Sequence, residues 1–385
     1  MTRAAALRSG LVIAALLSQS VGPGTAAGAE FPALSTGGFA RLHLLAGDIS
    51  AARDRAGDSE LWAPDIPVAG EPGLIRHRMN AHARESRIWV RAVQETPLGD
   101  LEALVEADLD GDRADGHDPR LRHAYLMLGP LLAGHTYTTF SNTSALADLD
   151  SGIAVGNVVT RHRLVRWQQP LGGTVLLSLA LEDSLNRLHF AGTDNIVSSG
   201  DRRPPDVVAR LDQTGEWGNL SLSMLAREIT TTSPTGTAAR SDGDLGTAFS
   251  LAGRIETGAL DNLRFMFNYG NALARYSTLS TYADATVTAE GQVALATTYS
   301  GLIAWQHFWS PRWRSSFALS LSVTDPHRTT SNRLTRESRS AHANLIWAPN
   351  QRISLGVEYL YGWRSLLSGE DGNLHRLQLT TRINF

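Results

Sequence analysis

Segments of about ten residues in which apolar and polar side chains alternate strictly recur along most of this chain. The segment at the end is the clearest. Successive side chains of a β-strand point to opposite faces, so each segment predicts a strand with one apolar face. In that last strand Leu377, Leu379, Ile383 and Phe385 share one face, opposite Arg376, Gln378, Thr380, Arg382 and Asn384.

About sixteen such segments follow one another, beginning near residues 37, 84, 99, 120, 131, 157, 173, 205, 218, 245, 261, 294, 313, 338, 352 and 374. Short connections fall at 96–100, 168–173, 213–218, 256–262, 310–312 and 348–351. Long connections alternate with them, at 48–80, 110–118, 139–156, 183–204, 228–244, 270–292, 325–337 and 365–373. Short turns on one side and long loops on the other are typical of transmembrane β-barrels, whereas a soluble β-sandwich has no such asymmetry. The predicted fold class is all-β, an antiparallel transmembrane barrel of about 16 strands, with short periplasmic turns and long extracellular loops.

No stretch beyond the N-terminal segment has the roughly 18 apolar residues that a membrane-spanning helix needs. A closed barrel is the other structure that satisfies every backbone polar group in hydrocarbon. Trp305, Trp309 and Trp313 bracket one short turn, and Tyr359 and Tyr361 lie towards the opposite end of their strand. Aromatic rings at both ends of the strands are expected at the two membrane interfaces.

The N-terminal segment has the features of a secretory signal peptide. Arg3 and Arg8 precede an apolar run at 11–17, and Ala27-Gly28-Ala29 forms a cleavage-site pattern. We therefore expect a signal peptide at 1–29 and a single barrel domain at 30–385. Cysteine is absent, so no disulfide stabilises the exported chain.

The segment RLRHAYLMLGPLLAGHTYTTF (120–140) resembles the stretch of DcaP-like porins that leads into their constriction loop. Further stretches resemble the same family in the same order, at 38–49, 83–93, 204–223, 261–271, 343–362 and in the last strand. The resemblance implies a homotrimer of sixteen-stranded barrels in the outer membrane of a Gram-negative bacterium. It also implies uptake of small organic anions, including dicarboxylates. The coiled-coil segment that precedes the barrel in some members has no counterpart here, so trimerisation would depend on the barrel walls.

An outer-membrane barrel has several expected partners. These are the lipid bilayer and its lipopolysaccharide, small anionic solutes in the pore, and the barrel-assembly machinery. Phe385, an aromatic residue that ends an amphipathic strand, resembles the signal that this machinery recognises.

Strand parity predicts which charged side chains face the lumen, and the inward set is mainly basic although the chain has a net charge of −3. The predicted pore-lining or substrate-contacting residues are Arg41, His43, Arg87, Arg91, Arg120, Arg122, Arg166, Arg210, Arg227, Arg254, Arg264 and Arg376, together with Arg314 and Arg382. The acidic side chains on the same faces are Glu102, Glu106, Asp108, Glu182 and Glu358.

Arginine rings in a pore favour anions, because the guanidinium stays charged and matches a carboxylate with two parallel hydrogen bonds. Every basic residue of this chain is an arginine. About half of the inward arginines are expected to brace the wall by pairing with Glu102, Glu106 and Asp108. Arg87, Arg91 and Arg122 are the strongest candidates for contacting a solute.

The loop at 139–156 follows the fifth predicted strand, where the resemblance implies an inward-folded constriction loop. Asp148 and Asp150 are expected to face the arginine wall across the narrowest point. The resulting transverse field would orient dipolar solutes. An ordinary external loop with two solvated carboxylates is the alternative.

One acidic loop, from Asp108 to Asp118, has carboxylates at alternating positions but lacks the glycine and the terminal glutamate of an EF-hand calcium loop. We expect no metal site and no cofactor. The near-neutral charge also gives no reason to expect a nucleic-acid partner.

Three other functions compete with an anion-preferring porin. A general or cation-selective porin is the nearest of them. A non-conducting structural or adhesin barrel would fill its lumen with large side chains, whereas Ser221, Ser316, Ser354 and Gly356 are predicted to face inward. An outer-membrane enzyme would need a nucleophile next to a histidine, and the sequence has no G-x-S-x-G motif.

Overall fold

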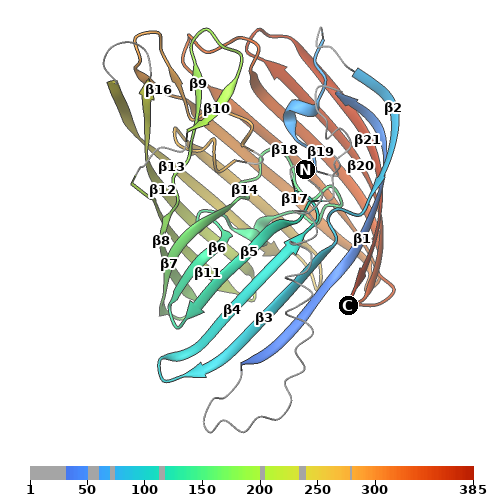
Figure 1. The fold of residues 1–385 in the computed structure, drawn as a ribbon. Helices are drawn as coiled ribbons and strands as arrows, with labels where there is room; N and C mark the ends of the chain where they lie inside the picture. The colour runs from blue at the N-terminus through green and yellow to red at the C-terminus, as the bar shows by residue number, and fades with distance from the viewer. Residues whose placement is uncertain are drawn as a thin grey trace, which may run out of the picture.

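The computed structural model describes residues 32–50, 60–69, 74–111, 118–199, 204–233, 240–277 and 280–385. Most of its strands form one closed antiparallel sheet of steeply tilted strands, visible as a barrel in Figure 1. Within the described residues, no helix is long and apolar enough to span a membrane. The signal peptide predicted at 1–29 lies outside the described residues.

The barrel strands follow one another in chain order. They are β1 (Ala33–Ser50), β2 (Leu74–His82), β3 (Arg87–Thr96), β4 (Gly99–Asp108), β5 (Arg120–Leu128), β6 (Leu131–Tyr137), β7 (Arg161–Gly172), β8 (Val175–Glu182), β11 (Asp206–Gly215), β12 (Gly218–Ser233), β13 (Arg240–Glu256), β14 (Asn262–Gly270), β17 (Thr297–Ser310), β18 (Trp313–Asp325), β19 (Thr335–Trp347), β20 (Ile353–Leu366) and β21 (Asp371–Asn384).

β2 and β3 are two parts of one strand, interrupted at residues 83–86. β2 pairs with the second half of β1 and β3 pairs with its first half. Counted this way the barrel has sixteen strands, which confirms the predicted fold class. Each predicted segment corresponds to one of these strands.

The sheet closes where the last strand meets the first, because β21 pairs with β1 from Phe39 to Gly47. At the end of this seam the Phe385 N–H donates to the Gly38 carbonyl at 3.1 Å, and the Gly38 N–H donates to the Phe385 carbonyl at 3.2 Å. The terminal residue therefore completes the hydrogen-bond ladder that a barrel in hydrocarbon requires.

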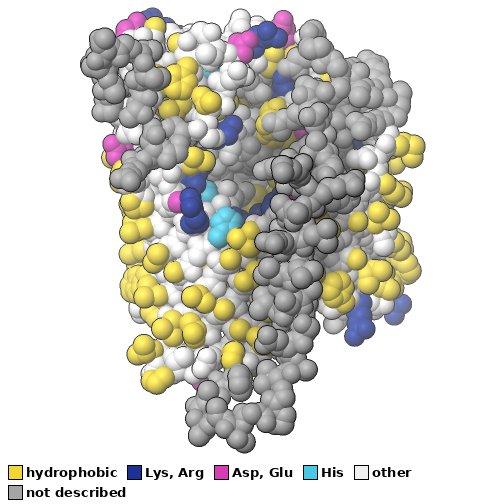
Figure 2. Space-filling view, in the orientation of Figure 1, with side chains coloured by type: hydrophobic (Ala, Val, Ile, Leu, Met, Phe, Trp, Pro, Cys, Tyr) yellow, Lys and Arg dark blue, Asp and Glu magenta, His cyan; other side chains and the backbone are white. Residues whose placement is uncertain are grey.

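The outer surface of the barrel is apolar, as the alternation predicted. Leu222, Leu319, Leu377 and Phe267 are exposed, and Figure 2 shows hydrophobic side chains spread over the visible wall. Near one set of turns Trp305, Trp309 and Trp313 are exposed, and the Trp313 ring stacks on the Trp347 ring at 6.0 Å. These rings fit the interfacial belt of a membrane barrel.

Two predicted loops contain strands that the sequence did not reveal. β9 (Asn186–Phe190) and β10 (Ile196–Ser199) form a hairpin in the 183–204 connection. β9 of this hairpin pairs with β15 (Ala285–Val287), which lies within the predicted 270–292 connection. β15 in turn pairs with β16 (Val293–Leu295), just beyond that connection. The result is a small four-stranded sheet at the end of the barrel that carries the long loops (Figure 1).

Two other connections are shorter than predicted. β12 and β13 pair continuously from Gly218 to Ser233, so most of the expected loop at 228–244 is strand. The connection expected at 365–373 is reduced to residues 367–370, between β20 and β21. Both errors arise because these strands are polar where they extend beyond the apolar band, which removes the alternation.

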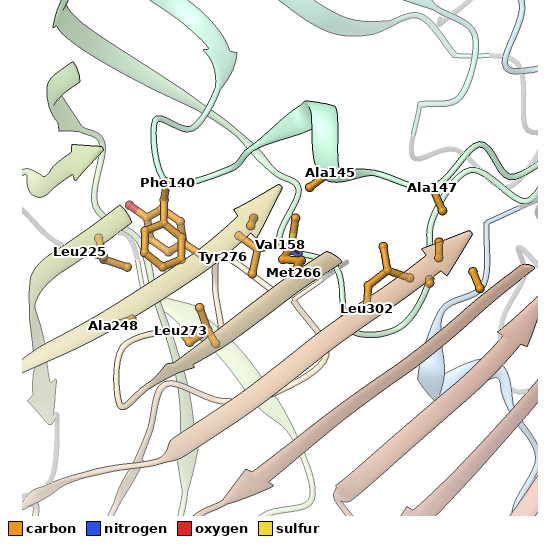
Figure 3. Packing of buried hydrophobic residues seen from close by; sticks show 14 of the residues in the cluster. Phe140, Ala145, Ala147, Val158, Leu225, Ala248, Met266, Leu273, Tyr276 and Leu302 are labelled. Carbon is orange, nitrogen blue, oxygen red and sulfur yellow. Dashed lines mark hydrogen bonds between the residues drawn. The ribbon is translucent and has the colours of Figure 1, made fainter. Parts of the chain in front are cut away.

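The largest hydrophobic cluster of the described residues lies inside the barrel, between inward-folded loops and the wall. Phe140, Ala145 and Val158 of one loop and Leu273 and Tyr276 of another pack on inward side chains, as Figure 3 shows. The wall residues beneath them are mostly small or flexible: Ala180, Ala248, Ala252, Met266, Leu302, Ala304 and Ala318. Small inward side chains thus make space for loops rather than for open solvent.

The first loop also folds inward, which the sequence did not predict. Its 3-10 helix η1 (Ala63–Asp65) lies next to Leu61 and Ile66, which pack on Val155, Leu360 and Leu374. The other short helix, η2 (Thr143–Ala145), belongs to the loop after β6, where the Asn142 side chain accepts a hydrogen bond from the Ser144 N–H.

Gly156 allows the loop after β6 to approach the wall closely. A Cβ at this position would lie 2.3 Å from both the Gly301 and the Leu321 carbonyl oxygens. We therefore predict that Gly156→Ala displaces the loop and costs about 1–3 kcal/mol of stability. Thermal unfolding followed by circular dichroism measures the change. Gly258→Ala is the control, since its Cβ meets nothing closer than 3.5 Å; equal melting temperatures for both variants would contradict the prediction.

Candidate functional site: the constriction loop and its arginines

The loop predicted at 139–156 crosses the lumen, as expected for a constriction, and is anchored to many strands. At its start the Asn142 Nδ2 donates to Asn219 Oδ1 and to the Ser221 hydroxyl, at 2.7 and 2.9 Å. At its end the Gly156 N–H donates to the Ser320 hydroxyl at 2.8 Å. Ser221, which the sequence placed in the lumen, therefore holds the loop.

The middle of the loop is fixed by Glu358 of β20. This buried carboxylate accepts hydrogen bonds from the Asp150 N–H at 2.6 Å and the Ser151 N–H at 3.3 Å. His342 Nδ1 lies 3.1 Å from the same carboxylate. The Asp150 carbonyl accepts from Arg41 Nη2 at 2.9 Å and from Gln378 Nε2 at 2.8 Å. Glu358 and Arg41 thus have structural contacts with the loop backbone.

On the β3–β5 wall, arginines and carboxylates alternate across the strands and form ion pairs. Arg87 pairs with Glu106 at 3.1 Å, and Arg91 pairs with Glu102 at 2.6 Å. Arg120 pairs with Asp108 at 2.8 Å. The carboxylates are the ones predicted to brace the wall, but the arginines that they pair with include Arg87 and Arg91, which were predicted to contact a solute.

Arg122 differs from its predicted role as a leading solute contact. Its Nη1 lies 2.6 Å from Asp108 and its Nε 3.2 Å from Glu106, and the side chain is nearly buried. The parity rule placed it correctly on the inner face. Parity gives the face of a residue but not the partners that occupy its hydrogen-bonding groups.

Three other residues predicted to line the pore are buried. His43 contacts the Thr380 hydroxyl at 3.0 Å and Glu85 at 3.4 Å. Arg227 is inaccessible to solvent and holds Asp284 at 2.9 Å and Asp206 at 3.4 Å. Arg376 is also buried. Loop residues at 185, 272 and 284 cover Arg227, and sequence alternation contains no information about loop packing.

Beneath the constriction loop, five arginines of the inner wall form what we call the arginine arc: Arg41, Arg254, Arg264, Arg314 and Arg382. Two pairs of them are directly opposite each other on neighbouring strands. Arg254 of β13 faces Arg264 of β14, and Arg41 of β1 faces Arg382 of β21. Like charges directly opposite in a sheet destabilise it, so this arrangement favours the presence of an anion.

Within the described residues, Arg264 and Arg382 form no ion pair with a carboxylate. Arg264 donates to Asn262 Oδ1 at 2.8 Å, to Gln306 Oε1 at 3.0 Å and to the Leu146 carbonyl. Arg382 donates to Asn384 Oδ1 at 2.8 Å, and its guanidinium lies 3.9 Å from the centre of the Phe39 ring. The other three arc arginines pair with Glu85, Glu256 and Asp148.

Asp148 reaches into this arc instead of facing the β3–β5 wall. Its Oδ2 accepts from Arg314 Nε at 2.6 Å and from Gln306 Nε2 at 2.8 Å. Because Asp148 is paired with Arg314, it contributes less to the transverse field that was expected between the loop carboxylates and the opposite arginines. Neither Gln306 nor Phe39 was predicted as a site residue, because uncharged inward residues carry no sequence signal.

A second group of arginines lies where the loop begins. Arg166 donates to the Thr139 hydroxyl at 2.8 Å and to the Tyr137 carbonyl at 2.6 Å. Arg210 donates to the Ser141 carbonyl at 2.6 Å and pairs with Asp212 at 2.6 Å. Glu182 is buried beside them and accepts from the Thr139 N–H at 2.7 Å. Both arginines are on the inner face, as predicted, and orient the loop.

Among the described residues, no group of three or more histidine, aspartate or glutamate side chains is placed to hold a metal ion. The central part of the acidic loop, residues 112–117, lies outside the described residues.

Asp150 lies in the loop next to Glu358, and one of its oxygens, Oδ2, is buried without a hydrogen-bond partner. Burial, together with the charge of Glu358, raises the pKa of Asp150 to about 7. A carboxyl whose pKa is raised on folding contributes stability at low pH, and this contribution is lost as pH rises through about 7.

We therefore predict that Asp150→Asn, which mimics the protonated group, becomes more stable relative to the native protein between pH 5 and pH 8. Melting temperatures of both proteins at the two pH values measure the effect. Asp212→Asn, which removes a carboxyl paired with Arg210, should not show the same gain. A stability difference between native protein and Asp150→Asn that does not change with pH would contradict the prediction.

Comparisons with known proteins agree with this geometry. The structure is similar to the outer membrane channel DcaP of Acinetobacter baumannii, with a TM-score of 0.75 and 19% identity, over 94% of this chain and 99% of that one. It also resembles OmpF of Salmonella typhi, with a TM-score of 0.57 and 10% identity over 91% and 97% of the two chains. An anion-selective porin from Comamonas acidovorans matches with a TM-score of 0.54 and 11% identity over 92% and 100%. No curated protein sequence matches the chain.

The structural neighbours establish the barrel fold, and the model of the DcaP outer membrane protein family matches residues 65–385. The match covers most of the chain and confirms the resemblance found in the sequence. The protein is therefore a channel of the Gram-negative outer membrane. The chain belongs to the DcaP outer membrane protein family.

Proposed function

We propose that this protein is a passive, anion-preferring porin for small organic acids, and that the arginine arc is its selective element. The observation that carries the proposal is the pair of arginines, Arg264 and Arg382, whose partners in the described structure are neutral. Each stands opposite a second arginine on the neighbouring strand. The arc therefore has an excess of positive charge, whereas every arginine of the β3–β5 wall pairs with a carboxylate.

Asp148 illustrates how the arc could receive a solute carboxylate. Its Oδ2 is bound by one guanidinium and one side-chain amide, while the side chain keeps 31% of its surface exposed. A free carboxylate could exchange with such contacts at Arg264 or Arg382, because charge-assisted hydrogen bonds to a solvated site are moderate in strength. A dicarboxylate could bind two arginines at once. Binding that is favourable but weak permits passage through a pore.

Several further features belong to this proposal. They are cleavage after a signal peptide at 1–29, a single barrel domain at 30–385, and assembly as a homotrimer in contact with lipopolysaccharide. Exposure of Phe385 on the outer face and its place in the closing seam support its recognition by the barrel-assembly machinery. The absence of enzymatic activity is part of the same proposal.

The direct test is the reversal potential of the reconstituted protein in a planar bilayer under a potassium chloride gradient. We expect chloride-selective steps that succinate reduces. The double variant Arg264→Gln/Arg382→Gln should lower the ratio of chloride to potassium permeability several-fold, because it removes the two unpaired charges from the narrow part of the pore. Raising the ionic strength should reduce the difference.

Two control variants make this test specific. Arg339→Gln removes a charge from the exposed outer side of β19 and should leave selectivity unchanged. Arg91→Gln/Glu102→Gln removes a neutral pair and should have little effect. Potassium-selective steps would contradict the proposal and favour the cation-selective alternative. Absence of conductance from folded protein would favour a structural barrel.

A further inference from the structure

A separate cavity of about 350 Å³ lies at the end of the barrel that carries the long loops. Its wall is formed by the ends of β18, β19 and β20, by Arg187 of β9, and by loop residues such as Trp62 and Tyr282. On β18 it reaches Thr324, four residues beyond Ser320, where the constriction loop is attached. Four residues of a strand span about 13 Å, so the cavity is distinct from the arginine arc and lies outside the constriction.

The charged lining of this cavity is mainly basic. Among the described residues of the lining there are three arginines, Arg187, Arg333 and Arg364, and one carboxylate, Asp194. Asp194 lies 3.5 Å from Arg333, and both are largely exposed at the rim. Arg364 donates to the Pro64 carbonyl at 2.7 Å. Arg333 and Arg364 therefore already have contacts of their own.

Arg187 is the central feature of this lining. Within the described residues its side chain forms no ion pair and no hydrogen bond, and its Nε is buried without a partner. Asp284, an acidic neighbour, uses its oxygens for Arg227 at 2.9 Å and for the Arg187 backbone N–H at 2.9 Å. A guanidinium that is partly desolvated and has no acceptor is a binding group for an anion.

The rest of the lining is amphipathic. Trp62, Tyr282, Ile196 and Leu334 supply apolar surface, and threonines such as Thr330 supply hydroxyl groups. Ligand sites of this size combine apolar walls with a few polar groups that fix orientation. A small inorganic anion would leave the apolar surface unused, whereas an aromatic or branched aliphatic carboxylate would cover it and reach Arg187.

We propose that this cavity is a binding site for an organic carboxylate with an apolar body, placed between the external medium and the constriction. That a solute binds here before it enters the constriction rests on the proposed channel function, but the binding itself does not. The carboxylate binds the Arg187 guanidinium and the apolar body lies between Trp62 and the other apolar walls.

Isothermal titration calorimetry of the detergent-solubilised native protein with benzoate tests this site, with benzyl alcohol as the neutral analogue. We expect benzoate to bind and benzyl alcohol to bind at least tenfold more weakly. Arg187→Gln should weaken benzoate binding roughly tenfold or more, because it removes a charge-assisted hydrogen bond. Leu334→Trp, which keeps the charge but fills the cavity, should also weaken it.

Two further variants distinguish a failure of this proposal from a failure of the proposed channel function. Arg339→Gln, on the outer side of the barrel, should bind benzoate like the native protein. Arg264→Gln/Arg382→Gln should keep benzoate binding at this site, and Arg187→Gln should keep the chloride selectivity measured in bilayers. No binding of benzoate to the native protein, equal affinity for benzyl alcohol, or native affinity in Arg187→Gln would overturn the proposal.

Discussion

The closed backbone hydrogen-bond ladder of the barrel is the constraint on which the other features depend. In hydrocarbon each unpaired N–H or C=O costs several kcal/mol, so the sheet must return to its own first strand. The pairing of β21 with β1, completed by Phe385 and Gly38, achieves this closure. Because the outer face must then be apolar, charged side chains are directed inward, and hydrophobic packing inside is available only to loops.

Loop packing determines which inward charges remain accessible. The constriction loop uses Glu358, Arg41 and Gln378 as anchors for its backbone. The loops nearer the long-loop end bury Arg227. On the β3–β5 wall each arginine pairs with a carboxylate of β4. The arginine arc keeps an excess of positive charge. This excess arises from where its arginines lie and which side chains they contact, and not from the composition of the chain.

The sequence was sufficient to predict the barrel, its number of strands and the inner face of its charged residues. Strand alternation has a direct physical cause, since one face meets lipid and the other does not. The site was only partly predictable. Parity placed Arg122 and Arg264 on the same inner surface, but it could not show that Arg122 is held by two carboxylates and Arg264 by neutral groups.

Loop structure was the least predictable part, because its contacts join residues far apart in the chain. The pairing of β9 with β15 and the position of Asp148 beside Arg314 depend on such contacts. Small inward residues such as Ser221 and Gly356 indicated an open lumen in the sequence. In the structure they accommodate the constriction loop, since a Cβ on Gly356 would meet Asp150 Oδ2 at 2.2 Å.

The most direct measurement is a crystal structure of the native protein soaked in sodium bromide, with bromide located by its anomalous scattering. The account predicts bromide in contact with the guanidinium of Arg264 or Arg382, and none between Arg87 and Arg122 on the balanced wall. Bromide bound only along β3–β5, or no bromide within the arginine arc, would contradict it.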